Sequence, residues 1–155
     1  PVIGRGKEAH EWVGPRPSHH TASFESDDID AVSDGKEPKS SNDHTIPRFT
    51  WWDHRGTAEW ITYSFEKPRR VGSCAVYWFD DTGVGLCRVP ASWRVSYKDG
   101  ETWRQVKATT GFGVDPDRYN EVQFEPVLTT ALRVEVQLQP AHSGGIFEWK
   151  VMEAK

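Results

Sequence analysis

The sequence contains little sulfur: its 155 residues include one methionine and only two cysteines, Cys74 and Cys87. Two cysteines do not make a disulfide scaffold, and no CxxC pair is present to hold a structural zinc ion. Cys74 lies in an expected strand and Cys87 in the loop after it, so either a bridge between them or a buried thiol at Cys74 fits the pattern. The cysteines exclude the disulfide-rich class and leave the compartment open.

Long apolar runs are also missing. No segment approaches the roughly 18 apolar residues that a membrane-spanning helix needs, and no secretory signal peptide is recognisable. We therefore expect no membrane partner. Because Pro1 stands where a newly made chain carries methionine, we expect a processed or excised part of a longer protein.

The motifs of the common enzyme classes are absent. The sequence has no GxSxG nucleophile elbow, no HExxH metal helix, no phosphate-binding glycine loop and no dinucleotide fingerprint. The adjacent acids Asp80 and Asp81, with His54, could serve a small hydrolase, but adjacent acids in a turn are usually solvated. We keep this hydrolase as a minor hypothesis and expect no catalytic residues.

Charge of one sign does not dominate either. The chain has 19 basic and 23 acidic residues, and its formal net charge is −4. A general nucleic-acid binder normally carries a basic face, so we expect no nucleic-acid partner. Hydrophobic content is low at 36%, but 12% aromatic residues bury much apolar area, and the length suits one domain with a real core.

Strand signals recur at regular spacing, whereas no segment has a sustained 3.6-residue period with caps. Apolar residues alternate in 61–65, 93–97 and 132–138, and residues 71–79 are nearly continuously apolar or small. The Asp-Gly pair at 99–100 predicts a hairpin turn. Seven or eight strands at this spacing predict an all-β antiparallel β-sandwich.

The first 18 residues differ from the rest. They are rich in glycine and proline and show no sustained period, which predicts a linker or N-terminal arm. Residues 19–155 are expected to form the β-sandwich. His10, His19 and His20 could be pictured as metal ligands, but we expect a solvated segment before the first strand.

Tryptophan, in contrast, is abundant. Three of the eight tryptophans lie within 46–60, in the sequence IPRFTWWDHRGTAEW. In an extended chain, the neighbours Trp51 and Trp52 face opposite ways, so they cannot both point into a core. One ring is then free to anchor the loop while another aromatic stays available to a ligand. This stretch predicts a recognition loop that leads into the strand after Trp60.

Five ordered pieces of the chain resemble one family. They are DG at 34–35 with TxW at 50–52, EWIT at 59–62 with KP at 67–68, the strand at 71–78, the hairpin at 90–103 and GIFEW at 145–149. In this order they resemble the galactose-binding-like β-sandwich (discoidin, or coagulation factor 5/8 type C) domains, which have a jelly-roll fold. The resemblance covers roughly residues 20–152.

Two stretches look like a narrower group. The long segment 46–60 and the sequence YWFDDTGVGLCRVPASW are similar to the accessory sandwich C-terminal to β-L-arabinofuranosidase-like glycoside hydrolases of bacteria. In such enzymes the sandwich accompanies a helical-barrel catalytic domain. That resemblance implies a module without a catalytic constellation and with a linker before it.

The family resemblance also implies a structural calcium ion. Calcium takes six to eight oxygen ligands, often from irregular loops. Family positions place its side-chain ligands at Asp34, Thr50 and Glu148, with backbone oxygens near Ala31 and Lys36. Without a metal, Asp34 would be a turn residue, Thr50 would carry a hydroxyl at a strand edge, and Glu148 would be an outward-facing charge. The loop before Thr50 is longer than the family's compact version, which leaves the carbonyl ligands open.

Family members bind ligands with loops at one end of the sandwich. Sugar recognition needs an aromatic face and planar polar groups. The residues that supply them in the corresponding loops, and that we expect to bind ligand, are Trp51, His54, Arg55, Asp80, Asp81 and Arg88.

Each of these has a structural alternative. Trp51 equally fits packing within the core or loop, and Arg55 with Asp53, or Arg88 with Asp81, equally fits a loop-fixing salt bridge. The other strand tryptophans alternate with polar neighbours and are expected in the core: Trp60, Trp93, Trp103 and Trp149.

Together these expectations describe a non-catalytic carbohydrate-binding module from a larger bacterial glycoside hydrolase, which it targets to polysaccharide. Its partners would be a galactose- or arabinose-containing glycan and the parent catalytic domain, in a secreted, periplasmic or cell-surface protein. The alternative is a structural or protein-interaction sandwich that packs on the parent's catalytic domain and binds no sugar. A large apolar patch around Trp51 and Trp52 without a groove would favour that alternative.

Overall fold

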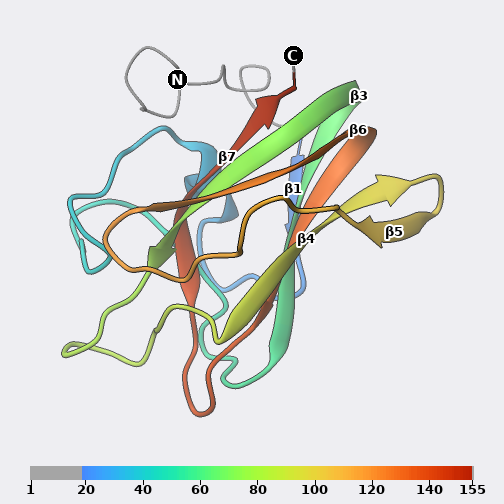
Figure 1. Cartoon of the computed structure of the whole chain (residues 1–155). Helices are drawn as coiled ribbons and strands as arrows, with labels where there is room; N and C mark the ends of the chain where they lie inside the picture. The colour runs from blue at the N-terminus through green and yellow to red at the C-terminus, as the bar shows by residue number, and fades with distance from the viewer. Residues whose placement is uncertain (1–18, 155) are drawn as a thin grey trace.

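Two very long strands, β3 (Ala58–Phe79) and β6 (Tyr119–Gln137), run side by side through both layers of the molecule (Figure 1). The computed structural model describes residues 19–154. The predicted arm at 1–18 lies outside the described residues, so the domain boundary at 18–19 stays a prediction.

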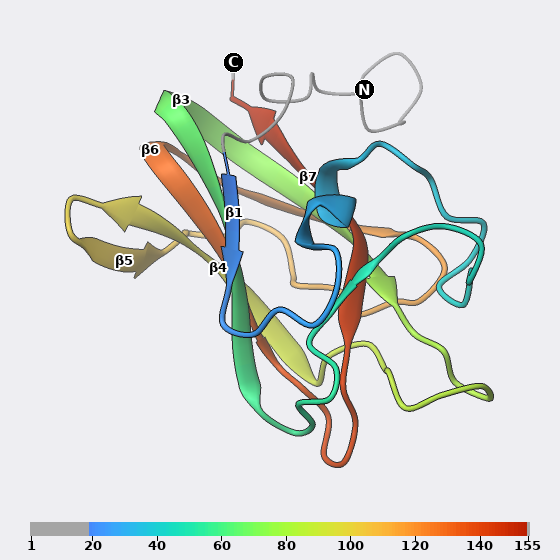
Figure 2. The same ribbon diagram turned by 180° about the vertical axis from the view of Figure 1, so that it is seen from behind.

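Shorter elements complete the sandwich. The strand order is β2-β7-β3-β6-β4-β5, β1 pairs with the first half of β3, and every pairing between these strands is antiparallel. One 3-10 helix packs beside β1 and β7 (Figure 2). The bounds are β1 His19–Ala22, η1 Ile29–Ser33, β2 Phe49–Thr50, β4 Ser92–Asp99, β5 Thr102–Gln105 and β7 Gly145–Glu153.

The long strands connect the two layers by bending. The first half of β3 pairs with β1 and the end of β6, and its second half pairs with β7 and the start of β6. The register shifts between Ser64 and Arg69, and again between Val71 and Ser73, which is where bulges turn the chain. The predicted all-β antiparallel β-sandwich is therefore confirmed.

One strand prediction was wrong. The segments 61–65 and 71–79 were expected as separate strands, yet β3 continues from one to the other through Lys67-Pro68. The pairing with β6 skips from Ser64 to Arg69, so no partner requires the N–H that proline lacks. The strand expected at 132–138 is likewise the end of a longer bent strand, β6, which begins at Tyr119.

Aromatic rings fill the space between the layers. Trp78 and Trp93 meet edge to face at 5.2 Å, and Tyr63 and Trp149 at 5.5 Å. Trp93 and Trp149 are buried, as predicted. Trp60 and Trp103 are not in the core: they are half-buried on the outer face of the sheet, because the alternation puts Ile61 and Tyr63 inside instead.

The two cysteines do not form a bridge. Cys74 and Cys87 are both buried free thiols, which confirms the buried thiol at Cys74. Burial raises the pKa of each thiol to about 12. Both side chains therefore act as small apolar groups.

His20 was expected to be solvated, but it lies in β1 with a buried side chain, edge to face with Tyr63. Burial lowers its pKa from 6.5 to about 4, and the Asp30 carboxylate, 3.7 Å from Nδ1, offsets only part of that effect. Between these values the unfolded chain binds the proton more readily than the folded one. The contribution of a neutral His20 to stability is therefore complete above pH 6.5 and is lost as the pH falls towards 4.

We therefore expect the free energy of unfolding to fall between pH 6.5 and pH 4, with His20 contributing at most about 1.36 kcal/mol per pH unit. Urea unfolding across this range measures it. In His20→Asn this contribution should disappear, whereas the neighbouring exposed His19→Asn should keep it. Equal pH profiles for the two variants would contradict the assignment.

Among the described residues, no helix is long and apolar enough to cross a membrane.

Candidate functional site

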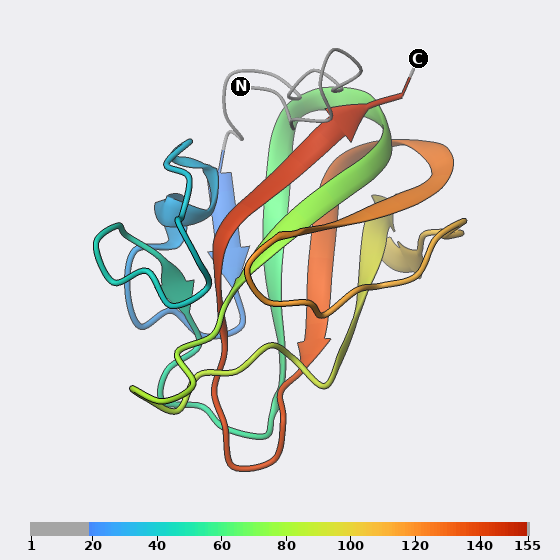
Figure 3. The ribbon, with the colours of Figure 1, turned by 60° about the vertical axis from the view of Figure 1, so that its left-hand side comes forward.

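Three loops converge at one end of the sandwich, the lower end in Figure 3. They span 51–57, 80–91 and 139–144. Backbone hydrogen bonds hold them together: Trp51 N–H donates to Gly144 O at 3.0 Å, and Ser143 N–H donates to Leu86 O at 2.9 Å. Loops tied in this way present a fixed surface at the end of a rigid scaffold.

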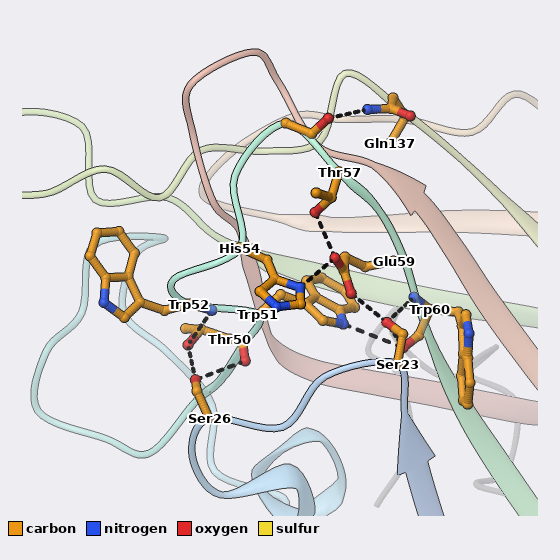
Figure 4. Close-up of polar contacts among 11 residues, drawn as sticks. Ser23, Ser26, Thr50, Trp51, Trp52, His54, Thr57, Glu59, Trp60 and Gln137 are labelled. Carbon is orange, nitrogen blue, oxygen red and sulfur yellow. Dashed lines mark hydrogen bonds and ion pairs between the residues drawn. The ribbon is translucent and has the colours of Figure 1, made fainter.

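The first of these loops is anchored by a buried carboxylate. Glu59 accepts hydrogen bonds from Ser23 Oγ at 2.6 Å, Thr57 Oγ1 at 2.6 Å and His54 Nδ1 at 2.8 Å (Figure 4). Burial by itself would raise the pKa of Glu59, but these hydrogen bonds outweigh it and hold that pKa below its usual value. His54 also stacks on Phe24 at 3.8 Å. We conclude that His54 fixes the loop. Its side chain is 39% exposed, and its expected role in ligand binding stays a prediction.

The neighbouring tryptophans face opposite ways, but in the reverse sense to the one expected. Trp51 is 0% exposed and its Nε1 donates to Trp60 O at 3.3 Å, whereas Trp52 is 39% exposed and projects away from the sandwich (Figure 4). Trp51 cannot reach a ligand, because the core covers its ring. Trp52 is the exposed aromatic of the stretch.

Trp52 borders a pocket of about 370 Å³, here called the loop pocket. Its walls come from the loop after β1, from β2 and the residues around it, and from the loop after β3. The lining residues are Ser26, Asp27, Arg48, Thr50, Trp52, Phe79, Asp81, Gly85, Leu86 and Cys87. The volume lies within the range of small-molecule sites.

Two arginines meet aromatic rings at the loop pocket. The Arg48 guanidinium lies 4.5 Å from the centre of the Phe79 ring, and Arg48 Nε has no hydrogen-bond partner within residues 19–154. The Arg55 guanidinium lies 4.7 Å from the centre of the Trp52 ring. Because Trp52 lines the pocket and Arg55 does not, Arg55 supports the ring from outside. Arg48, which the sequence reasoning missed, is the cation at the pocket.

Two carboxylates complete the walls. Asp27 accepts from Thr50 N–H at 2.9 Å and from Thr50 Oγ1 at 3.1 Å, and Asp81 accepts from Cys87 N–H at 2.8 Å. Each carboxylate is thus held in place by the backbone. The pocket combines an aromatic ring, a guanidinium and two fixed carboxylates, and Asp81 is the one residue predicted for ligand binding that lines it.

Asp80 and Arg88 make hydrogen bonds that stabilise the loop 80–91. Asp80 accepts from the N–H groups of Thr82 at 3.0 Å and Val89 at 2.9 Å, which closes the turn. Arg88 donates to the carbonyl oxygens of Gly85 and Cys87 and lies 3.8 Å from Asp81. Both residues order the loop, and neither lines the loop pocket, so their expected roles in ligand binding stay predictions.

A second cluster of charges lies where β7 passes the loop after η1. Glu148 is 1% exposed, and its Oε1 has no hydrogen-bond partner among the described residues; the same holds for Asp34 Oδ2. Burial and then the adjacent Asp34 carboxylate raise the pKa of Glu148 to about 10. Glu37 is neutralised by the Lys150 ammonium at 2.7 Å. Lys150 also lowers the pKa of Glu148, but by less than burial and Asp34 raise it, so the pair Asp34 and Glu148 carries excess negative charge when both are ionised.

This pair fits a divalent cation, because orphaned buried carboxylate oxygens are what such an ion binds. Thr50 does not fit, since its hydroxyl is held by Asp27 and Ser26 at the loop pocket. No group of three or more His, Cys, Asp or Glu side chains is arranged for a metal within 19–154. The Ala31 carbonyl accepts a hydrogen bond from Asp34 N–H, so Ala31 lies beside the pair. Lys36 also lies beside it, because Lys36 N–H donates to Asp34 Oδ1.

No family model matches the sequence, and no curated protein matches it. Solved structures do match in fold. A chain from the Streptococcus pneumoniae beta-galactosidase BgaA is similar with a TM-score of 0.72 and 22% identity, covering 94% of this chain and 97% of that one. The family 32 carbohydrate-binding module of Clostridium perfringens NanJ, solved with galactose, has a TM-score of 0.65 at 16% identity, covering 87% and 93%.

A third similar structure is chitosan-binding module 1 of a Paenibacillus chitosanase/glucanase, with a TM-score of 0.64 and 16% identity, covering 92% of this chain and 98% of that module. At these identities the comparisons establish the fold. The chain shares the antiparallel β-sandwich fold of these structures, as the sequence predicted.

Proposed function

We propose that this chain is a non-catalytic saccharide-binding module and that the loop pocket is its binding site. The observation that carries the proposal is the exposed Trp52 ring beside the Arg48 guanidinium, whose Nε has no hydrogen-bond partner within residues 19–154, and the fixed carboxylates of Asp27 and Asp81. The similar modules that bind galactose or chitosan favour it, because they share the fold over nearly their whole length.

The chemistry of the pocket suits a sugar. The C–H face of a pyranose or furanose ring packs on an aromatic ring such as Trp52. A guanidinium donates and carboxylates accept, so Arg48, Asp27 and Asp81 match the mixed donor and acceptor character of sugar hydroxyls. Leu86, which is partly exposed, extends the apolar wall. We propose a galactose- or arabinose-containing glycan as the ligand.

Hydrolysis by the chain itself is not proposed. Asp80 and His54, two members of the hypothetical hydrolase site, are committed to loop hydrogen bonds with Val89 and Glu59. A glycoside hydrolase needs one carboxyl to protonate the leaving group and another facing it across the sugar. We assign the chemistry instead to a parent glycoside hydrolase of the β-L-arabinofuranosidase-like group, secreted, periplasmic or on the cell surface of a bacterium, which this module would target to polysaccharide.

Calcium is proposed as a structural ion held by Asp34 and Glu148, with backbone oxygens near Ala31 and Lys36. When bound, it would supply the positive charge that Asp34 and Glu148 lack. In that position it would tie the loop after η1 to β7 and would take no part in ligand chemistry.

The competing function is a structural sandwich that packs on its parent's catalytic domain. The exposed apolar residues Trp52, Leu86 and Val84 at the loop end are the observation that favours it. Deleting the module would then lower the stability of the parent enzyme and leave its affinity for polysaccharide unchanged.

A glycan array in the presence of calcium tests the proposal, followed by affinity measurements on the sugars retained. We expect Trp52→Ala to weaken binding at least tenfold, which is about 1.4 kcal/mol, because stacking on the ring is lost. Leu128→Ala is the matched control, since Leu128 is also an exposed apolar residue (70%) but lies in β6 away from the pocket. An array without any retained glycan, from folded protein, would refute the proposal.

A further inference from the structure

A second hollow lies on the outer face of the sheet, in the layer that contains β4. Its volume is about 350 Å³. The registers of β3, β6 and β4 explain it: one row across the strands carries Ala58, Gln137 and Ser92, and the next row carries Trp60, Glu135 and Arg94. Small side chains at both ends of the first row leave a trough beside the large side chains of the second. We call it the sheet trough.

Trp60 forms one wall of the sheet trough. The side chains of Glu59 and Trp60 point to opposite sides of β3 (Figure 4). Glu59, which anchors the loop 51–57, also borders the trough, whereas the side chains of Trp60, Glu135 and Arg94 form its outer row. The Arg133 guanidinium lies 3.9 Å from the centre of the Trp60 ring and 4.1 Å from that of Trp103, stacked against both. Arg133 is not in the trough lining, so its guanidinium braces the Trp60 ring from behind. Trp103 contacts the Arg133 guanidinium and is not part of the trough lining.

Arg94 and Glu135, the two charged side chains in the row that carries Trp60, cancel in charge. Arg94 Nε donates to Glu135 Oε1 at 2.7 Å, and Ser96 Oγ donates to the same oxygen at 3.0 Å. An ion pair with no excess charge gives little attraction to an anionic or cationic partner. It does offer donors and acceptors to a neutral ligand rich in hydroxyl groups, next to a braced aromatic ring.

We propose that the sheet trough is a second saccharide site, which binds a neutral sugar ring against Trp60 with Arg94, Glu135 and Gln137 contacting its hydroxyls. It shares no lining residue with the loop pocket. The two sites lie on one rigid module, so a long glycan or two neighbouring chains can engage both, and the effective concentration at the second site then raises the overall affinity.

The test is an NMR titration of the ¹⁵N-labelled protein with galactose, lactose, arabinobiose and cellotetraose, following the Trp60 indole N–H. We expect that signal to shift in a saturable way with at least one of these neutral sugars. Trp60→Ala should weaken binding in the trough at least tenfold, read from the backbone amides of Ser92 and Gln137. Trp60→Phe, which keeps an aromatic ring, should bind sugar in the trough more tightly than Trp60→Ala does.

Trp103→Ala is the matched control, because it removes the other ring stacked on Arg133 but leaves the trough lining intact. It should keep binding within about twofold. The proposal is overturned if the Trp60 signal shifts with none of the four sugars. It is also overturned if Trp103→Ala weakens trough binding as much as Trp60→Ala, or if Trp52→Ala alone abolishes the Trp60 shift.

Discussion

Trp51→Ala is expected to lower the free energy of unfolding by about 3–5 kcal/mol, the usual cost of deleting a large aromatic side chain from a core. The ring is fully buried and meets Phe49 edge to face at 5.2 Å, and its Nε1 bonds to Trp60 O. Trp52→Ala, one residue later, should cost less than about 1 kcal/mol, because that ring is partly exposed and contacts the Arg55 guanidinium.

Urea unfolding of the two variants measures this contrast. If Trp51→Ala is too unstable to purify while Trp52→Ala behaves like the unaltered protein, the contrast is met in its strongest form. Similar losses in both variants would contradict the opposite orientation of the two rings. Trp51→Phe, which retains most of the apolar contact, should cost less than Trp51→Ala and keeps the comparison measurable.

Calcium is expected to raise the melting temperature of the protein, and chelation is expected to lower it. At a calcium concentration a thousand times the dissociation constant, the gain is about 4 kcal/mol for one site. The physical reason is the Asp34 and Glu148 pair, in which Asp34 Oδ2 and Glu148 Oε1 have no hydrogen-bond partner within residues 19–154. Burial first, and then repulsion from the Asp34 carboxylate, raise the pKa of Glu148 far above its usual value. A divalent cation removes that repulsion.

Glu148→Gln is the decisive variant. It keeps the shape of the side chain and removes one of the two negative charges, so the calcium-dependent rise should disappear while the metal-free protein stays folded. Glu153→Gln serves as the control, because Glu153 lies on the same strand but pairs with Arg69 at the surface. A melting temperature that is unaffected by calcium in the unaltered protein would exclude the cation site.

The fold could be predicted because its cause is local. Alternation in 93–97 and 132–138 sets which side chains face the core, and Asp99-Gly100 sets the hairpin, where Gly100 has a φ of 62°. The continuity of β3 through Pro68 could not be predicted, because it depends on a register shift against β6, a distant strand. Sequence patterns report the faces of a strand and not its partners.

The candidate site was harder to predict than the fold, because it too depends on contacts that the sequence pattern does not report. Two neighbouring tryptophans in an extended chain must face apart. Which of them enters the core depends on how the loop bonds to Gly144, a residue far away in the sequence, and to Glu59, and the pattern encodes neither contact. Arg48 carried no signal beyond its charge. Family position matched Thr50 to a metal ligand. In the structure its hydroxyl instead donates a hydrogen bond to Asp27, which lies in a loop where the sequence has no recognisable pattern.

The most direct test of the saccharide-binding proposal follows the tryptophan indole N–H signals of the calcium-loaded protein during titration with galactose and arabinobiose. The account predicts that the Trp52 signal shifts in a saturable way with at least one sugar while the buried Trp51 signal stays in place, and that Trp52→Ala abolishes binding at the loop pocket. An unchanged Trp52 signal with both sugars, or undiminished loop-pocket binding in Trp52→Ala, would contradict it.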